Sequence, residues 1–160
     1  MKILYLHQYF NTPSMPGSTR SFEFSSRLVE AGNVVHMVTS NWQGMSNRKF
    51  SKESGINVYW APVKYSNKMG FMKRIKSFML FIYYVLKISS KLDFNLIIAS
   101  STPLTIGIPA LLLKKTRKTK LIFEVRDLWP QLPIAMGFLK SKLLIFLSKW
   151  LENKIYNQSD

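Results

Sequence analysis

One short segment concentrates four kinds of reactive side chain: Glu124, Arg126, Asp127 and Trp129, in the run EVRDLWP. Glu124 lies in an otherwise apolar stretch, where a carboxylate needs a partner, and Arg126 is a candidate. Asp127 could accept the proton of a hydroxyl group or orient a substrate. Trp129 could stack on a sugar ring. The competing interpretation is structural: an Arg126–Asp127 ion pair beside a packed tryptophan.

A second candidate site is the loop 11–20, which directly precedes an expected helix. Its residues of interest are Pro16, Gly17, Ser18 and Arg20. Backbone N–H groups and the helix dipole at such a start favour a phosphate or a sugar. The loop matches neither GxGxxG nor a Walker A motif, which excludes the dinucleotide and P-loop interpretations. The alternative role of Ser18 and Thr19 is to cap the helix.

Hydroxyl groups and histidines mark the ends of further apolar stretches. Ser100, Ser101 and Thr102 follow one another and could bind a sugar or phosphate, although capping of the next helix is the alternative. His7 and His36 lie in expected strands and are predicted to be structural core histidines.

The composition limits the classes of protein. A chain of 160 residues, of which 47% are hydrophobic, can form one full-sized core. It has no cysteine, which excludes a disulfide scaffold, a thiolate zinc site and a cysteine nucleophile. With two histidines, a histidine-rich metal site is not expected.

The net charge is +15, which suggests a polyanionic partner: nucleic acid, anionic lipid or phosphorylated substrates. A solvated lysine-rich surface is the alternative. The basic clusters at 64–76, 114–120 and 140–142 each lie beside an apolar stretch, which favours a membrane surface. The longest apolar run, 78–86, is shorter than the roughly 20 residues that a spanning helix needs.

Hydrophobic periodicity predicts alternating strands and helices. Strands are expected at 2–9, 34–39, 58–61, 96–100 and 121–125, and helices at 19–31, 71–92, 105–113 and 142–157. Residues 40–55 and 126–137 are expected to be irregular. The pattern predicts an α/β, Rossmann-like, three-layer αβα domain with a mostly parallel sheet. In such a sheet, ligands bind at the carboxyl ends of the strands, where all three candidate loops would gather.

The same periodicity assigns inward faces to the two longest helices. In the first, the predicted inward residues are Phe71, Ile75, Phe78, Met79, Ile82, Val85 and Leu86. In the last, they are Leu143, Phe146, Leu147, Trp150, Leu151 and Ile155. The first helix is also the expected membrane contact, through Lys73, Arg74, Lys76, Phe78 and Phe81. The alternative is that it packs wholly on the sheet.

The segments KILYLHQYF, PSMPGSTR, SFEFSSRLVEAG, VVHMVTS and EVRDLWPQLPIAMG resemble a known family. They look like the N-terminal domain of a bacterial GT-B glycosyltransferase of family 4, and most of all like L-fucosamine (N-acetylfucosamine) transferases of O-antigen and capsule gene clusters. The resemblance covers essentially all of residues 1–160.

The resemblance implies an enzyme with two Rossmann-like domains facing a cleft. The N-terminal domain binds the acceptor, and the C-terminal domain binds the nucleotide-sugar donor through two Glu separated by seven residues. Such enzymes retain the anomeric configuration and need no metal or other cofactor. Their acceptor is often a sugar on a polyprenyl diphosphate, which implies peripheral association with the inner face of the cytoplasmic membrane.

The resemblance also suggests roles for individual residues. Gly17 matches the glycine of a loop that approaches the donor phosphate and the acceptor. Asp127 lies where many relatives carry His or Asp, and Arg126 replaces the more familiar His before it, so the acid/base assignment of Asp127 is open. Arg126 and Asp127 are the candidate catalytic residues. The candidate substrate contacts are Pro16, Gly17, Ser18, Arg20, Ser101, Thr102, Glu124 and Trp129.

We expect residues 1–160 to form the acceptor domain, with the donor domain outside this chain. Glu23 and Glu30 are separated by six residues on one helix and do not match the donor-binding pair. We therefore expect no turnover by this chain alone. The alternative is a non-catalytic basic module that binds nucleic acid or an anionic membrane. A small α/β hydrolase is excluded by the lack of a GxSxG motif.

Overall fold

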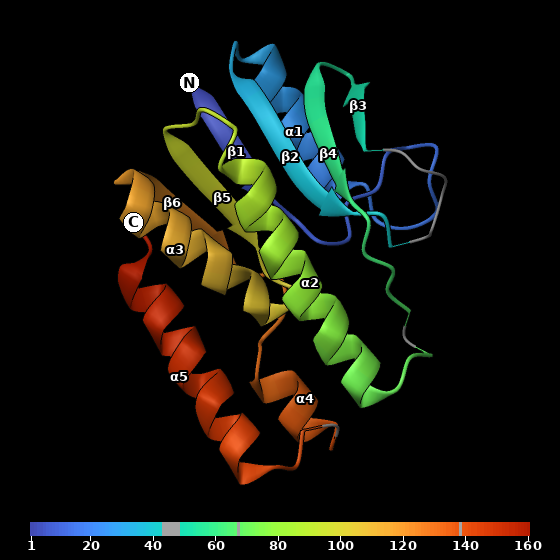
Figure 1. The fold of residues 1–160 in the computed structure, drawn as a ribbon, viewed down its shortest axis with the longest axis vertical. Coiled ribbons are helices and arrows are strands. Elements are labelled where there is room, and N and C mark those ends of the chain that lie inside the picture. Colours follow the sequence, from blue (N-terminus) through green and yellow to red (C-terminus); the bar gives the residue numbers. More distant parts are fainter. Residues whose placement is uncertain (43–48, 67, 138) are drawn as a thin grey trace.

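In the computed structural model, which describes residues 1–42, 49–66, 68–137 and 139–160, six strands form one sheet (Figure 1). The strands are β1 (Lys2–Leu6), β2 (Val34–Ser40), β3 (Phe50–Glu53), β4 (Ile56–Ala61), β5 (Leu96–Ser100) and β6 (Lys120–Glu124). Their order is β3-β4-β2-β1-β5-β6, and every pair is parallel except β3 with β4. The expected mostly parallel sheet is confirmed.

The antiparallel strand β3 was not expected, because the sequence around it is polar and irregular. It pairs with β4 through a two-residue turn at Ser54 and Gly55, both with positive φ (47° and 81°). Two such residues make the turn whose twist matches an antiparallel hairpin. The hairpin places β3 at the edge of the sheet. A two-residue connection can join only antiparallel strands, because parallel neighbours need a much longer crossover.

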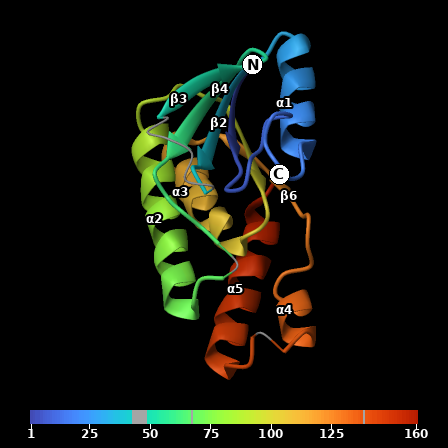
Figure 2. The ribbon, with the colours of Figure 1, turned by 90° about the vertical axis from the view of Figure 1, so that its right-hand side faces the viewer.

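Helices cover both faces of the sheet. They are α1 (Arg20–Glu30), α2 (Phe71–Ser89), α3 (Gly107–Arg117), α4 (Gln131–Ala135) and α5 (Lys142–Gln158), with a 3-10 turn, η1 (Leu104–Ile106), before α3. Helix α1 lies on one side of the sheet, and α2 and α3 lie on the other (Figure 2). The three-layer αβα architecture is confirmed. The short helix α4 lies in a segment that was expected to be irregular.

Each layer of helices has its own hydrophobic core. Ile3 and Tyr5 of β1 point toward α1, where they join Phe22 in one buried cluster. Leu4 and Leu6, the alternate residues of the same strand, join the cluster on the α2 and α3 side. This alternation explains why β1 is apolar throughout, since both faces of the strand are covered.

The buried face of α2 differs from the predicted one. Its fully buried positions recur every four residues, at Ser77, Phe81, Val85 and Ser89. Met79, predicted to point inward, is 52% exposed. Phe81, predicted to contact a membrane, is 1% exposed and lies in the core, so that prediction is wrong. The middle of α2 is apolar on all sides, so periodicity alone could not select the face.

Helix α5 also presents a different face from the predicted one. Of its predicted inward residues, Ile155 is fully buried, whereas Leu143 and Phe146 are each 65% exposed. Leu147 and Trp150 are exposed as well. Helix α5 contacts α3, β6 and η1, and Gly107 at the start of α3 permits a close approach by Ile155. The first half of α5 extends beyond these neighbours (Figure 1). Within the described residues, no helix has the length and apolarity needed to cross a membrane.

Candidate functional site

The carboxyl ends of β1, β5 and β6 meet at one edge of the sheet, because these three strands are parallel neighbours. The loops that follow them are 7–19, 101–103 and 125–130. All three candidate segments of the sequence therefore come together, as a doubly wound sheet requires of its ligand-binding edge. Hydrogen bonds across this edge hold the loops in place.

Glu124 is bound by residues from the other end of the chain. Its Oε1 lies 2.6 Å from Nη2 of Arg20, and the hydroxyl of Tyr5 donates to its Oε2 at 3.1 Å. The expectation that Arg126 would be its partner is wrong. Burial and the charge of Glu124 raise the pKa of Tyr5 well above its usual value, so the phenol keeps its proton and stays a donor. This cluster links the start of α1 to the end of β6.

Arg126 contacts His7 instead, with 2.9 Å between its Nη1 and Nε2 of the imidazole. Arginine can only donate, so Nε2 accepts and the ring proton lies on Nδ1. Nδ1 then donates to the hydroxyl of Ser21 at 2.7 Å. Burial, with the charge of Arg126, lowers the pKa of His7 to about 3. The guanidinium of Arg126 thus contacts a neutral imidazole ring. His7 is a structural core histidine, as predicted.

Ser101 and Thr102 connect the end of β5 to the loop after β6. The Ser101 hydroxyl accepts the backbone N–H of Arg126 at 2.7 Å, and the Thr102 hydroxyl donates to Oδ2 of Asp127 at 2.6 Å. Neither hydroxyl caps η1, whose N-cap is Pro103 without a side-chain hydrogen bond. The capping alternative is therefore wrong for both. Asp127 itself is exposed at the edge of the sheet, with one carboxylate oxygen held by Thr102.

The loop before α1 folds back on Asn11. Gly17 has φ +125°, and a Cβ at this position would overlap the side-chain nitrogen of Asn11. That nitrogen donates to the carbonyl of Ser18 at 3.4 Å. The N-cap of α1 is Thr19, which makes no side-chain cap hydrogen bond. Pro16, Gly17 and Ser18 are exposed, and their contact with a substrate stays a prediction.

Beside the Thr102–Asp127 pair lies an open cavity of about 550 Å³ with aromatic walls. Its lining residues are Tyr9, Trp42, Tyr65, Ser66, Lys68, Phe78, Thr102, Pro103 and Trp129. The ring of Tyr65 lies 5.0 Å from that of Tyr9 and stacks on Phe78 at 5.6 Å, centroid to centroid. Phe78 therefore faces this cavity, and its contact with a membrane stays a prediction.

Sequence reasoning found Trp129 and Thr102 of this cavity but missed three of its aromatic walls. Tyr9, Trp42 and Tyr65 each follow the carboxyl end of a strand, and that shared position was the available signal. The indole Nε1–H of Trp42 is buried and has no acceptor within the described residues.

No three of the histidine, aspartate and glutamate side chains that the structure describes come together as metal ligands. The polar groups at the edge can hold hydroxyl groups and anionic oxygens. The aromatic walls can hold a flat or ring-shaped apolar face. These properties match a site for a polyhydroxyl or phosphorylated ligand better than a site for a metal ion.

Comparisons with known proteins identify the fold. No family model matches the sequence, and no curated protein is significantly similar to it. Among solved structures, the chain is similar to sucrose-phosphate synthase from Thermosynechococcus elongatus, with a TM-score of 0.70 at 13% sequence identity. The match covers 99% of this chain and 41% of that one, so the chain spans less than half of its neighbour's length. The chain therefore shares its Rossmann-like fold with part of that enzyme.

Proposed function

We propose that this chain is the acceptor-binding part of a sugar-transferring enzyme of the GT-B type. The observation that carries the proposal is the aromatic cavity beside the Thr102–Asp127 pair, at the carboxyl edge of a parallel sheet. The fold shared with sucrose-phosphate synthase supports it. Aromatic faces and hydroxyl acceptors are the two features that a saccharide needs, and both come from loops that the sheet holds together.

Each group at the edge has a role in this proposal. Trp129 and Tyr65 pack against the faces of the acceptor sugar. The free oxygen of Asp127 accepts a hydrogen bond from the acceptor hydroxyl that is to be glycosylated. The guanidinium of Arg126, whose partner His7 is neutral, attracts an anionic phosphate oxygen.

The reaction we propose transfers a sugar from a nucleotide-sugar donor with retention of configuration and without a metal cofactor. N-acetyl-L-fucosamine is the proposed sugar, and a saccharide on a polyprenyl diphosphate is the proposed acceptor. Such an acceptor lies at the inner face of the cytoplasmic membrane and belongs to O-antigen or capsule synthesis. The donor binds to a second domain outside these 160 residues, so this chain alone should bind acceptor but not catalyse transfer.

The binding part of this proposal can be tested with the chain itself. The probe is N-acetylglucosamine joined through a diphosphate to farnesol, observed by saturation-transfer NMR and by tryptophan fluorescence. We expect Trp129→Ala to weaken binding about tenfold, because it removes one wall of the cavity. Asp127→Asn should weaken it less, since an amide still offers one acceptor oxygen.

Trp150→Ala is the matched control, because Trp150 is 52% exposed on α5 and lies outside the aromatic cavity. We expect it to bind the probe as the unchanged chain does. Equal weakening by Trp129→Ala and Trp150→Ala, or undetectable binding by the unchanged chain, would contradict the proposed function.

A further inference from the structure

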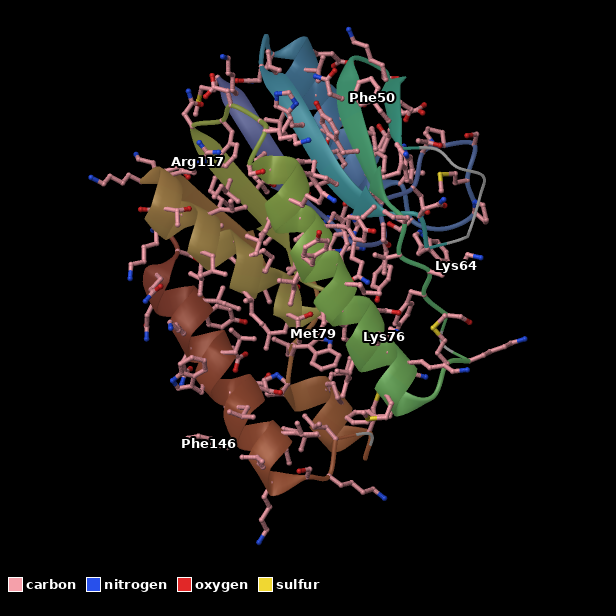
Figure 3. The ribbon with its side chains drawn as sticks, viewed as in Figure 1. Phe50, Lys64, Lys76, Met79, Arg117 and Phe146 are labelled. Carbon is pink, nitrogen blue, oxygen red and sulfur yellow. The ribbon has the colours of Figure 1, made fainter. Side chains whose placement is uncertain are left out.

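The ends of three helices extend together beyond the carboxyl edge of the sheet. The first turns of α2, the short helix α4 and the first half of α5 all lie at the lower end of the molecule in both views (Figures 1 and 2). Large apolar side chains are exposed on all three: Phe71, Met72, Leu132, Met136, Leu143 and Phe146. Met72 is 73% exposed, and Leu143 is 65% exposed. Phe146 points away from the rest of the molecule (Figure 3).

The same three segments are basic and contain no acidic residue. The exposed lysines of these segments, and of the residues just before α2 and α5, are Lys68, Lys73, Lys76, Lys140, Lys142 and Lys149. No aspartate or glutamate occurs in residues 54–92 or 128–151, which include the first turns of α2, all of α4 and the first half of α5. We call the six apolar side chains and these six lysines the basic–apolar end.

Three acidic residues lie at the opposite edge of the sheet. Glu30 ends α1, Glu53 ends the antiparallel strand β3, and Asp93 lies just before β5 begins. All three positions are at the amino edge, because α1 and β3 run opposite to the parallel strands. The amino edge also carries lysines, for example Lys2, Lys52 and Lys118, so both ends are basic. The basic–apolar end differs because the segments that form it contain no acidic residue. A flat anionic surface would orient such a molecule with that end facing it.

We propose that the basic–apolar end binds the surface of an anionic lipid bilayer. The exposed apolar side chains enter the boundary between headgroups and acyl chains, and the lysines contact lipid phosphates. Charge complementarity favours this occupant over a protein: exposed lysines accompany the apolar side chains, and Glu152, whose carboxylate contacts Gln131 of α4, is buried. Binding is at the surface, since no helix in the described part of the chain is long and apolar enough to span a bilayer.

This surface differs from the one that the sequence suggested. Phe81 does not belong to it because it is buried, and Arg74 donates its Nε–H to the carbonyl of Met69 at 2.9 Å within the molecule. Lys73 and Lys76 do belong to it, as α2 begins there. The helix α5, whose apolar residues were expected in the core, supplies Leu143 and Phe146. Lys68 also lines the aromatic cavity, which places that cavity beside the proposed membrane surface.

The test is co-sedimentation of the 160-residue chain with lipid vesicles, without any saccharide present. The vesicles contain phosphatidylcholine with about 30% phosphatidylglycerol, or phosphatidylcholine alone. We expect binding about tenfold tighter to the anionic vesicles, and a loss of about tenfold between about 0.05 M and about 0.5 M NaCl. Because no sugar is involved, the result is independent of the proposed transferase function.

Two pairs of variants locate the contact, with circular dichroism to confirm folding. The charge variant, Lys73→Gln/Lys76→Gln/Lys140→Gln/Lys142→Gln, should weaken binding about tenfold or more. Its control removes the same charge elsewhere, with Lys52→Gln/Lys91→Gln/Lys115→Gln/Lys118→Gln. The apolar variant Phe71→Ser/Phe146→Ser should also weaken binding, whereas its control, Phe24→Ser/Phe50→Ser, removes two half-exposed rings elsewhere and should not. Phe50 and Phe146 lie at opposite ends of the molecule (Figure 3).

Several results would overturn the proposal. Equal affinity for charged and uncharged vesicles would remove its electrostatic basis. If a variant and its control lost the same affinity for anionic vesicles, then net charge or overall apolarity, rather than a defined surface, would determine binding. Tighter binding to a single-stranded oligonucleotide than to anionic vesicles would favour nucleic acid as the partner, and dimerisation lost in Phe71→Ser/Phe146→Ser would favour a second copy of the chain.

Discussion

At the carboxyl edge of the sheet, the imidazole of His7 lies between the hydroxyl of Ser21 and the guanidinium of Arg126. Arg126 requires a neutral ring, because Nε2 must accept from a residue that only donates. Burial adds to this requirement, since a charged ring would lose its hydration. The consequence is a positive charge on Arg126 that stands beside a neutral group at the candidate site.

The low pKa of His7 makes the stability of the fold depend on pH. The pKa falls from 6.5 to about 3 on folding, so between these values the unfolded chain binds one proton more than the folded chain. The neutral His7 ring makes its full contribution to stability above pH 6.5. As the pH falls toward 3, the free energy of unfolding decreases by about 1.4 kcal/mol per pH unit.

His7→Gln should remove this pH dependence, because an amide can accept from Arg126 and donate to Ser21 but does not titrate. The measurement is urea unfolding of both proteins between about pH 5 and about pH 7.5. The unchanged chain should lose more stability at the acidic end than the variant. Parallel curves would contradict the neutral, buried ring.

Gly17 allows a second prediction at this scale, because its backbone has φ +125° and its missing Cβ leaves room for Asn11. Gly17→Ala should destabilise the fold by about 1–3 kcal/mol through backbone strain and the clash. Gly32→Ala is the matched control: Gly32 has φ +81° but nothing within 4 Å of its added methyl group. Urea unfolding measures the loss of stability in both variants. A smaller loss in Gly32→Ala than in Gly17→Ala would isolate the clash with Asn11, and an equal or larger loss would contradict that clash.

At the scale of elements, α3 and α5 approach each other at a glycine of α3. Gly107 begins α3, and a Cβ there would overlap Cδ1 of Ile155, which is fully buried on α5. This contact, with the C-terminal half of α5, fixes which face of the helix is buried. Further along the same two helices, Leu147, Trp150 and Leu151 of α5 line an open groove together with apolar residues of α3.

Gly107→Ala should therefore destabilise the protein by about 1–3 kcal/mol through overpacking. Ile155→Val alone should cost about 1 kcal/mol, because it leaves a small cavity. The double variant should lose somewhat less than the two single losses together, since valine lacks Cδ1, the nearest overlapping atom, although it keeps Cγ1. Thermal and urea unfolding of all four proteins measure this coupling, and additive losses would contradict the close approach.

At the scale of the whole molecule, the excess of positive charge works against folding. With a net charge of +15, the compact state brings lysines closer together than the unfolded chain does. The ion pairs between the described residues are exposed or partly exposed, for example Lys2 with Asp93 and Arg20 with Glu124. Such pairs add little stability, so self-repulsion is the larger electrostatic effect.

Salt should accordingly stabilise the isolated chain. Raising NaCl from about 0.02 M to about 0.3 M shortens the screening length severalfold and should raise the free energy of unfolding by about 1 kcal/mol. Urea unfolding at several NaCl concentrations measures this. A fall in stability with added salt would mean that attractive pairs outweigh the repulsion.

The sequence alone determined the alternation of strands and helices and hence the parallel, three-layer sheet. Local spacing is sufficient for this, because a strand or helix is recognised within about ten residues. It also determined that the loops after β1, β5 and β6 gather at one edge, since parallel strands end together. The predicted gathering of Arg20, Thr102 and Asp127 follows from this topology.

Only the tertiary structure decided which side chains pair with one another and which faces of the helices are buried. Glu124 pairs with Arg20, and Arg126 with His7, across more than 100 residues of sequence, and no local pattern specifies such pairs. The buried faces of α2 and α5 were also decided there, because these helices carry apolar residues on several sides and the neighbours select one. The aromatic cavity and the basic–apolar end therefore depend on packing between distant segments, which the sequence does not express locally.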